Sequence, residues 1–221
     1  MYSFLLKKDI DKNSVKPCYF LYGEEIFLGR QFLDDLKAVL VSGDDQDFHI
    51  ERFGLDQYSW MDVFDLARTV SFFPTARLIV VEIPKKREKL AKPEPGIIKS
   101  YFEDPTTETV MVFIHPFKLS GNSQAVKLFS SLPSSEVREM KPLNQSQITG
   151  WMDRRLGLSG KTASRDAKMR LMELAGNDRS LIDNELNNLV TFAAEKSVID
   201  LDDVNQISGW VKSFVEWEIT N

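Results

Sequence analysis

Two stretches of the chain are apolar at nearly every position: RLIVVEI at residues 77–83 and TVMVFI at residues 109–114. A strand with one exposed face alternates apolar and polar residues, whereas a strand covered on both faces does not. Continuous apolar runs that are rich in β-branched residues therefore predict strands at the centre of a sheet with helices on both faces. This requirement restricts the chain to the α/β class of folds more strongly than any other feature.

Further apolar runs and helix-like patterns alternate with these two strands in a regular order. They predict strands at residues 18–22, 48–53 and 136–140 and helices at residues 26–41, 59–71, 96–103 and 124–130. Strands that alternate with helices form right-handed βαβ units, which build a mostly parallel sheet. We therefore predict an α/β domain, with a parallel sheet flanked by helices, over residues 1–142.

After residue 142 the pattern changes to helices without a convincing strand. The predicted helices are residues 144–156, 164–174, 179–192 and 201–207. Asn144 and Asp200 are suitable N-caps, and Gly176 is suitable for ending a helix. A small all-helical domain over residues 143–208 is therefore expected. Residues 209–221 keep several apolar side chains and then stop, so we expect them to begin a further domain.

Composition excludes several classes of function. The net charge of −5 and isoelectric point near 5.2 argue against a protein that mainly coats nucleic acid. Cys18 is the sole cysteine, and two histidines far apart, His49 and His115, cannot complete a zinc site, so we expect no disulfide and no metal. No apolar run approaches the ~20 residues of a membrane span. We expect a cytoplasmic protein that has no membrane partner.

A strand, a glycine and a helix pattern follow one another in CYFLYGEEIFLGRQF at residues 18–32. Phosphate-binding sites are commonly built in this order. In a P-loop, G-x-x-x-x-G-K-[ST], the lysine binds phosphates and the hydroxyl binds magnesium. Here five residues separate Gly23 from Gly29, and Arg30 and Gln31 stand in place of the lysine and the hydroxyl.

Other residues near this turn also disfavour a nucleotide. Glu24 and Glu25 place negative charge at the start of the helix, where a phosphate would bind. The strand at residues 109–114 runs into His115 and Pro116 rather than into acidic residues that could hold magnesium, and we interpret His115 as a turn residue. We therefore predict that Gly23 belongs to a tight strand-to-helix turn without a nucleotide cofactor.

Three motifs give the chain a family resemblance. They are YFLYGEE at residues 19–25, SFFPTARLIVV at residues 71–81 and LIDNELNNL at residues 181–189. In order and spacing they resemble the delta subunit of the bacterial DNA polymerase III clamp loader, and the likeness runs through essentially the whole chain. One departure is Asn188, which stands where the family's helix usually has lysine.

The resemblance implies a domain organisation and a function. It implies an AAA+-like α/β domain at residues 1–142, a helical lid domain at residues 143–208, and the start of a truncated collar domain at residues 209–221. The implied function is to bind and open the beta sliding clamp for loading onto primed DNA, together with the gamma/tau and delta-prime subunits. Delta subunits hydrolyse no ATP, so a nucleotidyltransferase label would apply only to the whole polymerase.

A candidate clamp-binding segment follows the helix predicted at residues 59–71. Trp60, Val63, Phe64, Ala67 and Val70 already form one apolar stripe along that helix. The residues beyond the stripe are Ser71, Phe72, Phe73 and Pro74. From the pattern alone, both phenylalanines could instead fill the edge of the sheet. The resemblance implies the other interpretation, in which an adjacent apolar pair enters a hydrophobic pocket of the clamp.

Six cations cluster in the predicted helical domain, against two carboxylates, Asp153 and Asp166. They are Arg154, Arg155, Lys161, Arg165, Lys168 and Arg170. They could contact primer-template phosphates or a neighbouring subunit, or they could form an ordinary solvated helix surface.

Two rival functions remain open from the sequence. The chain could be a divergent nucleotide-binding α/β ATPase that holds ATP through other groups, or a stand-alone nucleic-acid-binding module. Magnesium-dependent nucleotide binding would favour the first. Salt-sensitive binding to primed DNA that does not depend on Phe72 and Phe73 would favour the second.

Overall fold

The computed structural model describes residues 14–41, 49–69, 77–86, 89–176 and 178–207. Contacts between residues divide the chain into two compact units, Met1–Pro142 and Leu143–Asn221. The residues predicted to begin a further domain, 209–221, lie outside the described part of the chain.

The first unit contains a five-stranded parallel sheet with the strand order β2-β3-β4-β1-β5. In chain order the strands are β1 (Cys18–Tyr22), β2 (His49–Gly54), β3 (Arg77–Glu82), β4 (Thr109–His115) and β5 (Ser135–Glu139). The two apolar runs form β3 and β4, with β4 at the middle of the sheet. The predicted α/β class is therefore confirmed, and the strands begin or end within one residue of the predicted positions.

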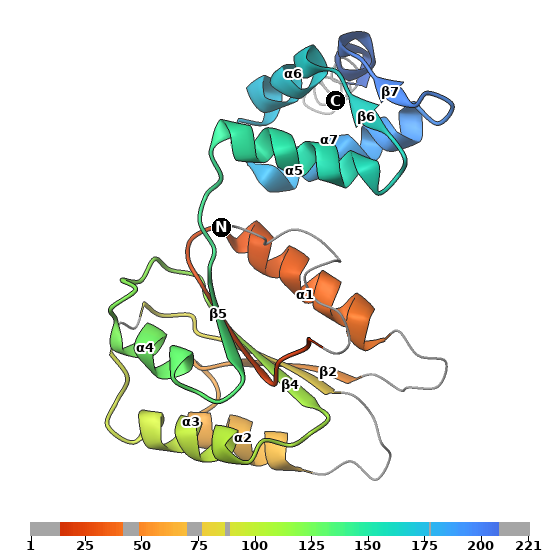
Figure 1. Ribbon diagram of the computed structural model, residues 1–221. Helices are drawn as coiled ribbons and strands as arrows, with labels where there is room; N and C mark the ends of the chain where they lie inside the picture. Colours follow the sequence, from red (N-terminus) through yellow and green to blue (C-terminus); the bar gives the residue numbers. More distant parts are fainter. Residues whose placement is uncertain (1–13, 42–48, 70–76, 87–88, 177, 208–221) are drawn as a thin grey trace, which may run out of the picture. The chain divides into compact units, whose positions relative to one another are not determined.

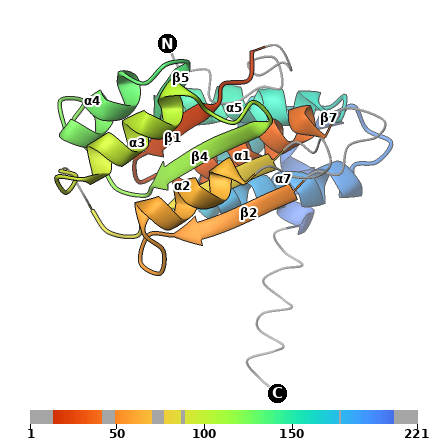
Figure 2. The same ribbon diagram turned by 90° about the horizontal axis from the view of Figure 1, so that it is seen from below.

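Helices cover both faces of this sheet. They are α1 (Ile26–Leu40), α2 (Trp60–Arg68), α3 (Glu94–Glu103) and α4 (Gln124–Ser130). Figure 1 shows α1 on one face and α2, α3 and α4 on the other, and Figure 2 views the unit from the side of α2 and α3. The prediction for α2 was too long, because Thr69 already has an extended backbone and ends the helix.

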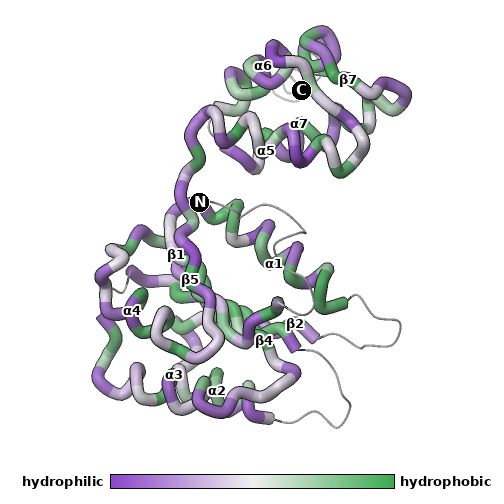
Figure 3. Tube along the Cα trace, in the orientation of Figure 1, coloured by the Kyte–Doolittle hydropathy of each residue, from purple (hydrophilic) through white to green (hydrophobic). Residues whose placement is uncertain are grey.

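Aromatic side chains fill the core between the sheet and helices α2, α3 and α4. The rings of Phe20 on β1 and Phe129 on α4 stack with centroids 4.3 Å apart, and Phe113 on β4 lies 4.9 Å from Phe129. Trp60 and Phe64 bring the apolar stripe of α2 onto Phe113. The five residues between Thr109 and His115 in β4 are all apolar, whereas Figure 3 shows α1 alternating between hydrophobic and hydrophilic residues. Such alternation is expected of a helix with one buried face.

The second unit is mainly helical. It contains α5 (Gln145–Gly157), α6 (Arg165–Ala175) and α7 (Arg179–Phe192), followed by helical residues 201–207. The expectation that this region has no strand was wrong. β6 (Thr162–Ala163) and β7 (Val198–Ile199) pair in parallel. Two-residue strands are too short to produce a periodic sequence pattern.

The predicted helix ends in this unit are confirmed. Asn144 caps α5 through a reciprocal capping box with Gln147, in which each side chain accepts a hydrogen bond from the other residue's backbone N–H. Gly176 ends α6 with a φ of 61°. Asp200 accepts a hydrogen bond from the backbone N–H of Asp203 at 3.0 Å, at the start of helical residues 201–207.

The side chain of Asp203 in turn binds the backbone of Asp200, and it also binds a lysine. Its carboxylate accepts hydrogen bonds from the Asp200 backbone N–H at 3.0 Å and from Lys196 Nζ at 2.7 Å. Burial alone would raise the pKa of the Asp203 carboxyl, but the hydrogen bonds from Lys196 and Asp200 outweigh it and lower the pKa. The ionised carboxylate therefore stabilises the fold above its ordinary pKa of 3.8, and this contribution is lost as the pH falls through the lowered value.

We predict that Asp203→Asn lowers the free energy of unfolding at pH 7 by about 1–2 kcal/mol, because an amide cannot replace both charge-assisted contacts of the carboxylate. The difference from the wild type should shrink as the pH falls below about 4. Urea unfolding at several pH values measures this difference in the free energy of unfolding. Asp202→Asn, which changes the exposed neighbouring carboxylate, is the control. An equal loss of stability at pH 7 and at pH 3 would contradict the assignment.

Candidate functional site

The turn after β1 uses its backbone N–H groups within the protein. Gly23 N–H donates to the carbonyl of His115 at 3.0 Å, and Glu25 N–H donates to the carbonyl of Met140 at 3.2 Å. At the first turn of α1, Ile26 and Leu28 donate to the carbonyls of Glu24 and Glu25. A phosphate-binding turn instead points several free N–H groups at the anion. The donors named here are already paired.

Met140 occupies the space beside this turn. It follows β5, is 1% exposed, and donates its own N–H to the carbonyl of Tyr22 at 2.6 Å. Gly23 has a φ of 131°, and a Cβ at this position would overlap the carbonyl oxygen of Met140. A Cβ at Gly29 would lie 2.8 Å from the sulfur of Met140. Both glycines are therefore explained by close packing against Met140 and need no phosphate.

The charged groups at this turn are also unfavourable for an anion. Glu25 is the N-cap residue of α1, and the exposed Glu24 precedes it. Negative charge at a helix N-terminus stabilises the helix and repels phosphate. His115 is not a turn residue as predicted. It is the last residue of β4 and 1% exposed, and its burial lowers its pKa, which favours the neutral imidazole.

The predicted clamp-binding residues, Ser71, Phe72, Phe73 and Pro74, lie outside the described residues, but the helix that precedes them is described. α2 begins at a capping box in which Ser59 and Asp62 bond each other's backbone N–H groups. Its apolar stripe is confirmed in the described part, because Trp60, Val63, Phe64 and Ala67 are all buried. The helix is therefore firmly docked on the sheet.

The last carbonyls of α2 are bound by side chains from other elements. Thr106 Oγ1 donates to the carbonyl of Ala67 at 3.0 Å. Arg77 Nη1 donates to the carbonyls of Leu66 at 3.3 Å and Thr69 at 2.8 Å. The final carbonyls of a helix have no partner within the helix, so these bonds fix the position at which α2 ends.

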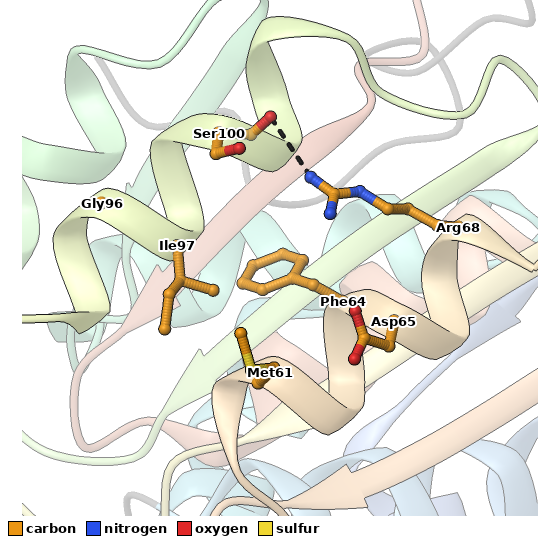
Figure 4. A pocket seen from close by; sticks show the side chains of 7 residues that line it. All are labelled: Met61, Phe64, Asp65, Arg68, Gly96, Ile97 and Ser100. Carbon is orange, nitrogen blue, oxygen red and sulfur yellow. Dashed lines mark hydrogen bonds between the residues drawn. The ribbon is translucent and has the colours of Figure 1, made fainter.

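A shallow hollow of about 260 Å³ lies between α2 and α3. Its lining residues are Met61, Phe64, Asp65, Arg68, Gly96, Ile97 and Ser100. Figure 4 shows the Phe64 ring between the two helices and the Arg68 side chain reaching across them to the Ser100 carbonyl, 3.5 Å away. The Arg68 guanidinium also lies 5.8 Å from the centroid of the Tyr101 ring. These contacts tie the end of α2 to α3.

Lys161 does not belong to a basic surface. Its side chain is buried, and Nζ donates to the carbonyls of Ala193, Ala194 and Lys196 at 2.6, 3.1 and 2.7 Å. An ammonium has three N–H donors, so each of them has a protein acceptor. The burial and the three carbonyl partners of Lys161 therefore disfavour the suggested contact with DNA or a neighbouring subunit. The lysine instead binds the backbone that follows α7.

Local partners also engage three of the other five predicted cations. Arg155 pairs with Asp183 at 2.8 Å, Lys168 with Asp153 at 2.7 Å and Arg170 with Glu173 at 3.1 Å. Arg154 and Arg165 are exposed. Surface ion pairs of this kind are ordinary features of helices and do not indicate a phosphate site. The contact of these five cations with DNA or a neighbouring subunit stays a prediction.

Sequence reasoning missed two residues that shape this region, Met140 and Arg77. A glycine within a helical pattern, such as Gly29, indicates that another part of the chain approaches closely, and this signal could have revealed a contact. It could not have named Met140. Arg77 begins an apolar strand, and a charged residue in that position needs a partner, but the sequence does not show which one.

The fold and the turn define a class of protein: a parallel α/β domain, followed by a mainly helical unit, in which protein groups fill the turn after the first strand. Residues 19–139, more than half of the 221-residue chain, match the family described as DNA polymerase III, delta subunit, and the chain belongs to this family.

A curated Bacillus subtilis sequence and a solved Bacillus subtilis structure are similar to the chain. DNA polymerase III subunit delta of strain 168 is 28% identical over 207 residues, which cover 90% of this chain and 59% of that protein. The solved structure of the Bacillus subtilis DNA clamp loader delta protein (YqeN) has a TM-score of 0.69 and 27% identity, with 88% of this chain and 59% of that one covered. The chain thus spans about three fifths of the length of these relatives. None of the helices among the described residues could cross a membrane.

We predict that Gly23→Ala lowers the free energy of unfolding by about 3 kcal/mol, because the new methyl group must displace the Met140 backbone at an unfavourable φ. Thermal unfolding followed by circular dichroism measures the effect. Gly96→Ala is the matched control, since a Cβ there meets no atom within 4 Å and alanine is favoured in helices. Equal stability of the two variants would refute the packing role of Gly23.

Proposed function

We propose that this chain is the clamp-binding part of a clamp-loader delta subunit, which binds and opens the beta sliding clamp for loading onto primed DNA. Phe72 and Phe73, flanked by Ser71 and Pro74, enter a hydrophobic pocket of the clamp. The chain acts in the cytoplasm within a complex that contains the gamma/tau and delta-prime subunits. It hydrolyses no ATP itself and contributes to nucleotidyl transfer only as part of the polymerase.

The observation that carries the proposal is the match of residues 19–139 to the delta family. The matched region includes the turn at Gly23 and the segment that contains Phe72 and Phe73. The names of the two relatives, a subunit of DNA polymerase III and a DNA clamp loader delta protein, agree with this role. The fixed end of α2 supports it further, since an apolar side chain binds best when a rigid element presents it.

The proposed mechanism needs no chemistry from this chain. Binding shifts the clamp towards an open ring only if the open form offers the chain better contacts than the closed form does. ATP would act in other subunits of the loader, by exposing or hiding this surface. The paired N–H groups and the two carboxylates at the Gly23 turn support the proposal that ATP acts in other subunits and not in this chain.

We predict that Phe72→Ala combined with Phe73→Ala weakens binding to the cognate sliding clamp by at least about 100-fold, because each buried apolar anchor is typically worth roughly 2–4 kcal/mol. Surface plasmon resonance measures the affinity, and circular dichroism verifies folding. Phe192→Ala, which removes another phenyl ring that is 51% exposed, should change the affinity less than twofold. Unchanged clamp binding by the folded double variant would rule out this site.

We further predict that the chain shows no saturable, magnesium-dependent binding of a fluorescent ATP analogue. The reason is that Met140 and paired N–H groups occupy the turn beside Gly23. Titration of the chain at micromolar to millimolar nucleotide tests this, with a P-loop ATPase as the positive control. Saturable binding that unlabelled ATP reverses would support the rival nucleotide-binding function instead.

A further inference from the structure

Five lysines lie beyond the carboxyl ends of β3 and β4. The segment after β3 contains Lys85, Lys86, Lys89 and Lys92, and the segment after β4 contains Lys118. The described residues of these two segments, 84–86, 89–93 and 116–124, include no carboxylate. The chain as a whole has a net charge of −5. Positive charge is therefore concentrated at this edge of the sheet, against the charge of the whole chain.

Contacts hold the two segments next to each other. They follow neighbouring strands of the sheet, and the Leu90 N–H donates to Gln124 Oε1 at 3.2 Å. The Leu90 side chain also packs against the hydrophobic core. Burial lowers the pKa of His115, and the positive charge of Lys86 lowers it further, which places this lysine near the end of β4. Lysines from both segments thus belong to one surface.

Four of these lysines have no partner within the protein. Lys85, Lys89, Lys92 and Lys118 are exposed, and none of them forms an ion pair or a side-chain hydrogen bond in the part of the chain that the structure describes. In the second unit, by contrast, three of the predicted cations pair with carboxylates. The four lysines are therefore available to an external anion.

The described carboxylates around this surface do not neutralise it. Glu82 pairs with Arg52 at 3.3 Å, and Glu94 accepts a hydrogen bond at 2.6 Å from the backbone N–H of the residue three positions earlier. Glu24 and Glu25 follow β1, which lies on the other side of β4 from β3. The same edge of the sheet is thus negative after β1 and positive after β3 and β4.

The chemistry of the surface favours a phosphate backbone as its ligand. Lysine binds phosphate as a compact point charge, whereas arginine is the residue that recognises carboxylates through two parallel hydrogen bonds. All the cations among the described residues of the surface are lysines. Its one aromatic ring, Phe117, packs edge-on against His115 with centroids 5.4 Å apart, so it is not a free platform for stacking bases. Contacts to phosphates alone carry no sequence information.

We propose that Lys85, Lys89, Lys92 and Lys118 form a binding surface for the phosphate backbone of double-stranded DNA of any sequence. The carboxyl ends of parallel strands are the usual place for a ligand in folds of this class. The inference rests on the proposed function in one respect, since loading onto primed DNA brings a duplex to this chain. DNA binding itself can be measured without the clamp.

The test measures the affinity of the whole chain for a fluorescein-labelled DNA duplex by fluorescence anisotropy at several salt concentrations. Lys85→Gln combined with Lys118→Gln should weaken binding about tenfold at low salt. It should also lower the slope of log affinity against log salt concentration by about 2, because each phosphate contact contributes about 1. Lys85→Arg combined with Lys118→Arg keeps both charges and should bind within about twofold of the wild type.

A matched control removes the same amount of charge elsewhere. Arg52→Gln combined with Lys141→Gln takes away two cations that are 51% and 49% exposed but are paired with carboxylates. This variant should change the affinity for DNA less than about twofold. Circular dichroism verifies the folding of every variant. Polyglutamate, labelled in the same way, represents an acidic protein partner and should bind more weakly than DNA.

Three results would overturn the inference. They are no binding of the duplex by the wild type at about 100 µM chain and low salt, an equal loss of affinity in the control variant, and an unchanged salt slope in the folded Lys85→Gln, Lys118→Gln variant. Tighter binding of polyglutamate than of DNA would also overturn it and assign the surface to an acidic protein.

Clamp binding separates this inference from the proposed function. The Phe72→Ala, Phe73→Ala variant should bind the duplex as the wild type does, because the lysine surface does not include these residues. A wild-type chain that binds DNA through the lysines but does not bind the cognate clamp would support the inference and contradict the proposed function. A chain that binds the clamp but not DNA would give the opposite result.

Discussion

The contact between Met140 and the turn at Gly23 is the constraint on which the first unit depends. Met140 donates to the end of β1 and accepts from the start of α1, so one residue joins β5, β1 and α1. The glycine at position 23 is required because the backbone of Met140 approaches it so closely. The same contact fills the place where a phosphate would bind in a related fold. This close packing is also the physical reason why we predict that the turn binds no nucleotide.

Because the turn at Gly23 packs against Met140, we interpret the first unit as a rigid support. Its aromatic core fixes α2 on the sheet through Trp60 and Phe64, and α3 holds the other side of α2 through Arg68. The end of α2 is bound by Thr106 and Arg77. Several independent contacts therefore fix the end of α2, and the predicted clamp-binding segment follows that end. The proposed binding of the sliding clamp needs this kind of rigidity.

The fold could be predicted from the sequence wherever burial leaves a periodic pattern. β3 and β4 are apolar throughout because both of their faces are covered, and the stripe of α2 appears in its spacing. Contacts between a long side chain and distant carbonyls leave no such pattern. For this reason Lys161 was predicted on a basic surface although it is buried, and the roles of Met140 and Arg77 were not predicted. The proposed clamp-binding segment was suggested by resemblance alone, because two adjacent phenylalanines are also compatible with a core position.

Hydrogen exchange measured by mass spectrometry tests the central claim most directly, since it reports on both regions in one experiment. The exchange of the chain alone is compared with that in the presence of the cognate sliding clamp and, separately, of ATP with magnesium. A support that binds the clamp beyond α2 predicts slower exchange in peptides over residues 60–77 with the clamp, and unchanged exchange over residues 18–32 with ATP. Slower exchange over residues 18–32 with ATP, or no clamp effect over residues 60–77, would contradict the account.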